Sequence, residues 1–141
     1  LIVPPAVSLA LSGAMPFGFV VIGLGSMAWV AGFDVLYATA DYEIDREQGL
    51  HSIPARFGIP AALIISRLLH ATAIILLAIA GVVLGTGALF AFGVLAAAVL
   101  LAYEQSLVSS NDLSKLNMAF FTMNGVIAVV FGTFVVIGEV I

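Results

Sequence analysis

The chain has 141 residues, of which 63% are hydrophobic and only 9% are charged. A soluble domain averages about 25% charged residues, so this composition is typical of a membrane protein. The formal net charge is −4 and no basic patch is present, which gives nucleic-acid binding no support. The chain contains no cysteine, which excludes disulfides and thiolate chemistry.

The apolar runs predict an all-α fold, a multi-pass transmembrane helical bundle in the lipid bilayer. Residues 1–12 are too short to cross a membrane, which takes about 20 residues, so we interpret them as the end of a helix that began upstream. The chain starts inside this run and not with Met, so we expect a fragment whose upstream part is missing. Complete spans are predicted over residues 17–41, 59–84, 88–103 and 116–137.

Two polar segments, residues 42–58 and 104–115, separate these spans. Arg46 and Arg56 lie in the first segment and Lys115 ends the second, whereas the glycine turn near residue 85 carries no charge. Because basic residues favour the cytoplasmic side, both polar segments are predicted to face the cytoplasm from the inner membrane.

The segment from residue 32 to residue 58 holds five of the eight acids. At about 100° per residue in a helix, Asp34, Tyr37, Asp41 and Asp45 fall on one stripe, because their offsets are 3, 7 and 11 residues. Three carboxylates and a phenol would thus line one face at successive turns.

An opposite stripe consists of Gly18, Gly25 and Gly32. Small residues at this spacing let a neighbouring helix approach closely. The helix is therefore predicted to have a packing side and a chemical side.

Carboxylates in or near a bilayer cost at least a few kcal/mol each, so the acidic stripe needs compensation. A divalent cation would supply it, and Mg²⁺ is usually held by one or two carboxylates together with substrate phosphate. We therefore predict Asp34, Asp41 and Asp45 as metal ligands. The alternative is a solvated helix end, which explains Asp45 well and Asp34 poorly.

Three arginines flank this predicted metal site. Arg46, Arg56 and Arg67 could bind a diphosphate through their forked guanidinium groups. Ordinary loop charge is the alternative for Arg46 and Arg56, and structural pairing with an acid is the alternative for Arg67, which lies inside a span. Tyr37 could position an aromatic substrate or a phosphate oxygen, or it could be a core tyrosine.

The last span carries Asn117 and Asn124 on one stripe, with Phe121 close to it. These residues could line a substrate cavity. Buried amides also bridge helices, and this is the reading that we favour for the asparagines. A tunnel for a long apolar tail could be walled by Phe90, Phe92, Phe120, Phe121 and Phe131. Phenylalanines in a membrane bundle more often only pack or face lipid, and this is the alternative for them.

Together these motifs resemble the second aspartate-rich motif of the UbiA superfamily of intramembrane aromatic prenyltransferases. The resemblance rests on Trp29-Val-Ala-Gly-Phe-Asp34, on Asp34-x-x-Tyr37-x-x-x-Asp41-x-x-x-Asp45-Arg46 and on Gly49-Leu-His-Ser-Ile-Pro-Ala-Arg56-Phe-Gly58. The 4-hydroxybenzoate polyprenyltransferase branch is the most similar, and the likeness extends over essentially the whole chain.

This resemblance implies nine transmembrane helices around a cavity that opens to the cytoplasm, with two aspartate-rich motifs facing each other. Residues 1–141 would be the C-terminal half of this single domain, namely the end of helix five plus helices six to nine. Mg²⁺ would hold the diphosphate of a polyprenyl diphosphate donor, and the acceptor would be an aromatic acid such as 4-hydroxybenzoate.

Within that site the resemblance implies Asp41 and Asp45 as the strongest metal ligands and Asp34 as ligand or base, with Asp34, Tyr37 and Asp41 as the catalytic set. The first motif, Asn-x-x-x-Asp-x-x-x-Asp, is absent from this sequence. We therefore expect the chain to need the missing N-terminal half and to be inactive alone.

Three other functions compete with this one. A dihydroxynaphthoate of menaquinone synthesis could be the acceptor, and nothing in this half separates the two. A CDP-alcohol phosphotransferase needs an Asp-x-x-Asp-Gly-type motif, which is absent. A cation-binding transport or structural subunit would have acids at membrane depth on several spans, whereas the acids outside residues 32–58 lie near span ends or in a loop.

Overall fold

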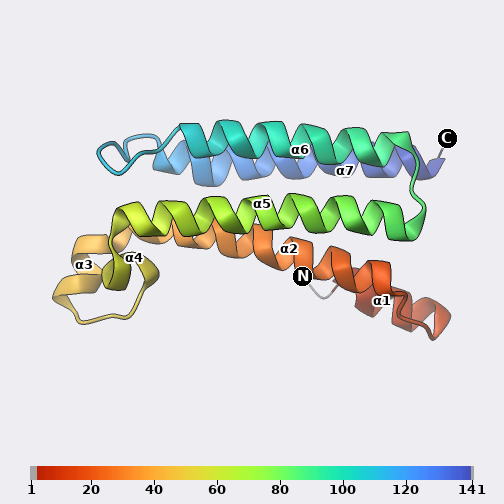
Figure 1. Ribbon diagram of the computed structural model, residues 1–141, viewed down its shortest axis with the longest axis horizontal. Coiled ribbons are helices and arrows are strands. Elements are labelled where there is room, and N and C mark those ends of the chain that lie inside the picture. The colour runs from red at the N-terminus through yellow and green to blue at the C-terminus, as the bar shows by residue number, and fades with distance from the viewer. Residues whose placement is uncertain (1–2, 141) are drawn as a thin grey trace.

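Apolar runs of about 20 residues form the long helices of the computed structural model, which describes residues 3–140 (Figure 1). This part of the chain contains helices and no β-strand. The helices are α1 (Val3–Ser12), α2 (Phe17–Tyr37), the 3₁₀ turn η1 (Ala38–Asp41), α3 (Tyr42–Glu47), α4 (Ile53–Phe57), α5 (Ile59–Leu84), α6 (Ala88–Ser106), the π-helical turn η2 (Met118–Met123) and α7 (Asn124–Val140).

Four stretches of the described chain are long and apolar enough to cross a membrane. They are Phe17–Glu47, Ile59–Leu84, Ala88–Ser106 and Met118–Gly138. The predicted all-α multi-pass bundle is therefore confirmed. The third span is three residues longer than predicted, and the fourth begins two residues later.

Helix α2 packs closely along α5 through its glycine face. Gly18, Gly25 and Gly32 are all buried, and a Cβ atom at Gly32 would overlap the imidazole of His70 on α5. A Cβ at Gly18 would overlap the side chain of Leu84 in the same way. The predicted packing stripe is therefore confirmed, and its partner is α5.

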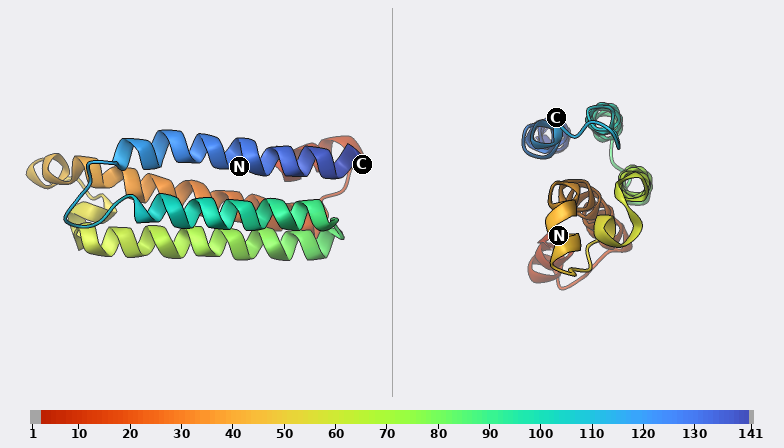
Figure 2. Two further views of the ribbon diagram at one scale, coloured as in Figure 1. Left: turned by 90° about the horizontal axis from the view of Figure 1, so that it is seen from above. Right: turned by 90° about the vertical axis from the view of Figure 1, so that its left-hand side faces the viewer.

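Helices α6 and α7 form a second pair that lies beside the first (Figure 2). The two pairs are joined by a core in which Leu101 of α6 and Ile127 of α7 are buried, with Trp29 of α2 and Ile74 of α5 packed against them. Gly85 makes the tight reversal between α5 and α6 possible, because its φ of 68° lies in the left-handed region that glycine tolerates.

Both polar connections lie at the same end of the bundle (Figure 1). One comprises α3 and α4, and the other joins α6 to η2. In the second, Ser109 and Asp112 exchange backbone hydrogen bonds of 2.9 and 3.1 Å. Hydrogen bonds from the side chain and the backbone N–H of Ser114 hold the pKa of Asp112 below its ordinary value.

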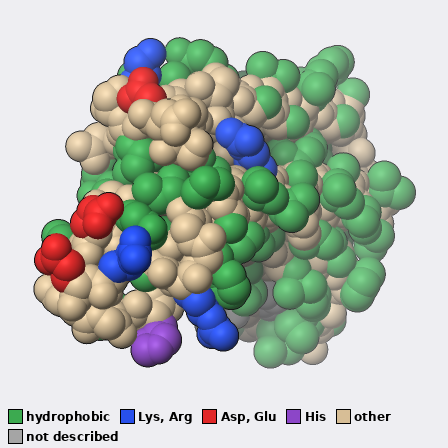
Figure 3. Space-filling view, turned by 60° about the vertical axis from the view of Figure 1, so that its left-hand side comes forward, with side chains coloured by type: hydrophobic (Ala, Val, Ile, Leu, Met, Phe, Trp, Pro, Cys, Tyr) green, Lys and Arg blue, Asp and Glu red, His purple; other side chains and the backbone are tan. Residues whose placement is uncertain are grey.

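The space-filling view shows the charged side chains gathered toward this polar end, while hydrophobic side chains cover the rest of that face (Figure 3). This distribution suits a molecule whose polar end lies at a membrane surface and whose long helices lie in the bilayer.

Candidate functional site

The acidic stripe begins on α2 and continues past a break in the helix. Asp34 lies on α2, Asp41 ends η1 and Asp45 lies on α3. Four residues at about 120° each, instead of about 100°, turn the chain by about 80° more than a regular α-helix would. Asp41 and Asp45 are therefore rotated away from Asp34, and the single narrow stripe expected from a continuous α-helix is wrong.

The break has a local cause at Thr39. This side chain is buried, and its hydroxyl donates a 2.6 Å hydrogen bond to the carbonyl oxygen of Leu36. A threonine hydroxyl that bonds back to a carbonyl of the preceding turn competes with the backbone ladder and bends helices. The buried hydroxyl of Thr39 thus stabilises the turn that changes the direction of the acids.

The three carboxylates are open to a ligand. Asp34 and Asp41 are exposed and Asp45 is half-buried, and no basic group of the described residues lies within ion-pair distance of them. They are oxygen donors of the kind that Mg²⁺ prefers. They do not converge, however, because no group of three acids or histidines in the described part of the chain could enclose a metal ion.

Two of the predicted arginines line one pocket in the polar segment that follows the acids. Arg46 follows Asp45 on α3, Arg56 lies on α4, and both line a pocket of about 540 Å³ at the polar end. The other lining residues are Gly49, Leu50, His51 and Ala55. Arg46 also donates a 3.0 Å hydrogen bond to the hydroxyl of Tyr42.

We refer to this as the loop pocket. Its two guanidinium groups and one imidazole can bind a polyanion, and His51 is a member that the sequence did not single out. Arg67, the third predicted arginine, does not line the loop pocket; it lies in a groove between α5 and α6.

Tyr37 is half-buried at the end of α2 and packs on aromatic side chains of η2. Its ring centroid lies 4.2 Å from that of Phe120 and 5.8 Å from that of Phe121. Phe33 contacts Phe120 edge-on at 5.3 Å. These ring contacts join α2 to the π-helical turn. They hold the side chain of Tyr37, which lies between Asp34 and Asp41 in the sequence, against η2.

The asparagines of the last span do not share one face. Asn117 is exposed, whereas Asn124 is half-buried and accepts a 3.0 Å hydrogen bond from the indole N–H of Trp29. The intervening π-helical turn has more residues per turn than an α-helix, which separates the two side chains. The helix-bridging role of Asn124 is confirmed, while a part for Asn117, Asn124 and Phe121 in a substrate cavity stays a prediction.

A small apolar cavity lies farther along the bundle. It measures about 260 Å³, and Phe90 and Phe131 line it together with Phe19 of α2. The rings of Phe90 and Phe131 are 5.7 Å apart. Two of the predicted tunnel phenylalanines therefore do meet, between α6 and α7.

A buried polar network joins α2, α5 and α6 and was not foreseen. The side-chain amide nitrogen of Gln105 donates to Ser66 Oγ at 2.8 Å and to His70 Nδ1 at 3.0 Å, and Ser66 donates to the carbonyl oxygen of Gly32 at 2.7 Å. Glu104 is completely buried beside them, with its Oε1 3.8 Å from His70 Nδ1.

The network positions the ring of His70. Because an amide nitrogen can only donate, Nδ1 of His70 is the acceptor when Gln105 is oriented in this way. The sequence signal for this network was the presence of polar residues in or at the end of apolar spans, namely Ser66, His70, Glu104 and Gln105. Ser66 and His70 are four residues apart, which places them on one face of α5.

Comparison with known proteins identifies the family to which these features belong. Residues 1–126 match the UbiA prenyltransferase family. The chain belongs to this family. No solved structure matches it significantly.

The curated relatives of this UbiA chain carry a consistent name. The chain is 34% identical to the 4-hydroxybenzoate octaprenyltransferase of Aeromonas salmonicida over 127 residues. The matched region covers 90% of this chain and 44% of the relative. The protein of that name from Saccharophagus degradans is 32% identical, with 90% and 42% covered. That from Escherichia coli O139:H28 is 29% identical, with 90% and 43% covered. The chain thus spans less than half the length of the curated relatives it matches.

Proposed function

We propose that this chain forms part of a membrane prenyltransferase that moves a polyprenyl group from polyprenyl diphosphate to an aromatic acid such as 4-hydroxybenzoate. The observation that carries the proposal is the loop pocket, which brings Arg46, Arg56 and His51 together directly after the aspartates of a UbiA-family chain. The names of the curated relatives support 4-hydroxybenzoate as the acceptor.

The residues of the polar end divide the work of binding the donor. Arg46 and Arg56 pair with the diphosphate oxygens through charge-assisted hydrogen bonds. Asp41 and Asp45 would hold Mg²⁺, and Asp34, which is rotated away from them in this structure, would serve as a further ligand or as the base near the acceptor. When bound, Mg²⁺ would neutralise charge that develops on the departing diphosphate.

In the reaction the bond between the allylic carbon and the diphosphate oxygen breaks, and a ring carbon of the acceptor bonds to the allylic carbon. The ring then loses a proton, for which Asp34 is the proposed acceptor. Apolar surroundings such as the cavity between Phe90 and Phe131 hold the prenyl tail and exclude water from the reacting carbon. The polar end faces the cytoplasm of the cell in this proposal.

Membranes that carry this chain together with the N-terminal half of a 4-hydroxybenzoate octaprenyltransferase test the proposal. Transfer to radiolabelled 4-hydroxybenzoate should require Mg²⁺ and should be lost in Asp41→Ala and in Asp45→Ala. The matched control is Asp112→Ala, an exposed acid at the same end of the molecule, which should retain transfer.

Transfer only to a dihydroxynaphthoate would change the proposed acceptor but not the proposed mechanism. Full activity in both aspartate variants would exclude their metal role. Absence of transfer to either acceptor, with the halves shown to be assembled, would overturn the proposed function.

A further inference from the structure

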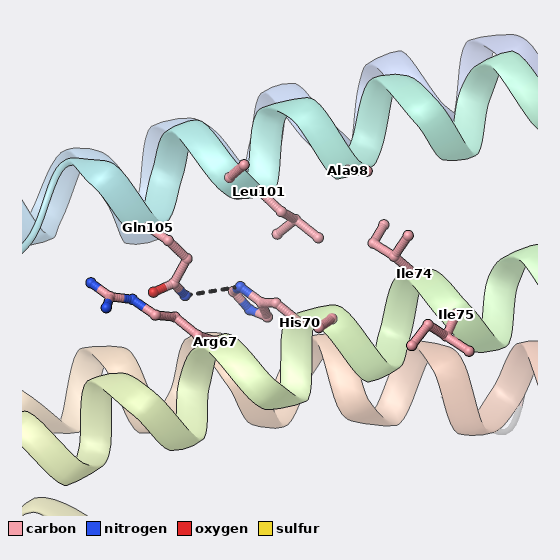
Figure 4. A pocket seen from close by; sticks show the side chains of 9 residues that line it. Arg67, His70, Ile74, Ile75, Ala98, Leu101 and Gln105 are labelled. Atoms are coloured by element: carbon pink, nitrogen blue, oxygen red, sulfur yellow. Dashed lines mark hydrogen bonds between the residues drawn. The ribbon is translucent and has the colours of Figure 1, made fainter.

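A second pocket, the α5–α6 groove, is lined by residues of these two helices and by none of the acids. It measures about 430 Å³ and runs between α5 and α6, with Ile74, Ile75 and Leu101 among its apolar walls (Figure 4). Arg67 and Gln105 stand at the end nearer the polar loops. His70, which packs against Gly32 of α2, also lines the groove, and no acid is among the lining residues.

The charge of Arg67 is unmatched within the described chain. Its side chain is exposed, and none of the acids whose side chains the structure describes lies within ion-pair distance. It lies about two turns inside α5 and extends toward the polar end, as an arginine does when it reaches for a membrane surface (Figure 4). A cation in this position attracts an anion located at headgroup depth.

Gln105 contributes an unmet hydrogen-bond acceptor to the same end. Its amide nitrogen lies within hydrogen-bond distance of Ser66 and His70. Its carbonyl oxygen Oε1 is buried and has no partner among the described residues. Because this oxygen is closed to solvent, a ligand in the groove would meet the guanidinium group of Arg67 and the apolar walls.

We propose that the α5–α6 groove binds an anionic membrane phospholipid of the phosphatidylglycerol class. Its phosphate, which carries one negative charge, pairs with Arg67, and one acyl chain lies along Ile74, Ile75 and Leu101. A polyprenyl diphosphate shares the anion and the tail, but it carries more charge than one arginine matches.

Native mass spectrometry of the full chain, extracted from membranes in mild detergent and titrated with phosphatidylglycerol, tests this site. The unaltered chain should retain phosphatidylglycerol in preference to phosphatidylcholine. Arg67→Gln should weaken phosphatidylglycerol binding by at least about fivefold. Lys115→Gln is the matched control, because it removes an exposed positive charge at the same end but outside the groove.

A second pair of variants tests the acyl chain. Ala71→Phe places a ring in the groove from an exposed position and should lower phosphatidylglycerol binding without loss of folding. Ala128→Phe, at an exposed position of α7, should leave binding unchanged.

Equal binding by the unaltered chain and Arg67→Gln would overturn the proposal, as would equal retention of phosphatidylcholine. Displacement of phosphatidylglycerol by farnesyl diphosphate at equal concentration would reassign the groove to the prenyl donor and would also overturn it. The proposal does not depend on prenyl transfer, since lipid retention is measured without acceptor or metal.

Discussion

The contact between Gly32 and His70 shows how a single residue controls the packing of two spans. The imidazole lies where a Cβ atom on Gly32 would stand, so only glycine allows α2 to come this close. The same approach lets the carbonyl oxygen of Gly32 accept from Ser66. A residue with no side chain thereby supports both the packing and the buried polar network.

Gly32→Ala should therefore destabilise the chain by about 1–3 kcal/mol, the usual cost of overpacking a core. The free energy of unfolding, measured by dodecyl sulfate titration in mixed micelles, would show the loss. Gly125→Ala is the control, because a Cβ there meets no atom within 4 Å and alanine favours a helix by up to about 1 kcal/mol. Equal stabilities for both variants would mean that His70 moves aside freely.

At the scale of elements, short interruptions of helices aim the functional side chains. The 3₁₀ turn η1 rotates Asp41 and Asp45 away from Asp34, and the π-helical turn η2 brings Phe120 and Phe121 onto Tyr37 while it separates Asn117 from Asn124. Both interruptions occur where α2 and the last span meet near the polar end. The residues proposed for the chemistry therefore lie in or next to these two irregular helical turns.

The hydrogen bonds of Ser66 and Gln105 join α2, α5 and α6, and their contribution to stability can be measured. Ser66→Ala removes the donor to Gly32 and the acceptor for Gln105, so the free energy of unfolding should fall by about 1 kcal/mol, within the range of hydrogen bonds between membrane helices. Ser106→Ala is the control, since this exposed hydroxyl bonds only within α6.

A double-mutant cycle with Gln105→Leu separates coupling from packing. The loss in the double variant should be smaller than the sum of the single losses, because each single change already breaks the bond between the two side chains. Strict additivity would show that Ser66 and Gln105 stabilise the chain independently.

At the scale of the whole molecule, the four spans place both polar connections at one end, and the positive charges lie with them. Arg46, Arg56 and Lys115 belong to these connections, whereas the turn at Gly85 carries no charge. The distribution follows the positive-inside rule. It is the basis for the proposal that the loop pocket, and with it the proposed chemistry, faces the cytoplasm.

Single cysteines test this orientation cleanly, because the chain has none of its own. Gln48→Cys and Ser110→Cys, one in each polar connection, should react with a membrane-impermeant maleimide in inverted vesicles and not in intact spheroplasts. Ala88→Cys, at the opposite end, should show the reverse pattern. Labelling of Gln48→Cys and Ser110→Cys from opposite sides would contradict the fold, and labelling of both from outside would invert the orientation.

Local features of the sequence determined the class of protein, the number of spans and most of their bounds. Hydrophobic runs must bury their backbone as helices in a bilayer, and this requirement does not depend on distant contacts. The spacing of Gly18, Gly25 and Gly32 predicted a packing face for the same reason, since helical periodicity is local. The order of acids, tyrosine and arginines also pointed to the family before any geometry was known.

Tertiary structure decided where those side chains lie. A regular helix would have aligned Asp34 with Asp41 and Asp45, and only the buried environment of Thr39 shows why the chain tightens there. Arg67 was grouped with the other arginines because all are cations near one polar segment, yet packing of α6 beside α5 places it in a separate groove. Which polar residues of two spans meet, as Gln105 and His70 do, depends on the packing and rotation of whole helices against one another, and no local pattern encodes that.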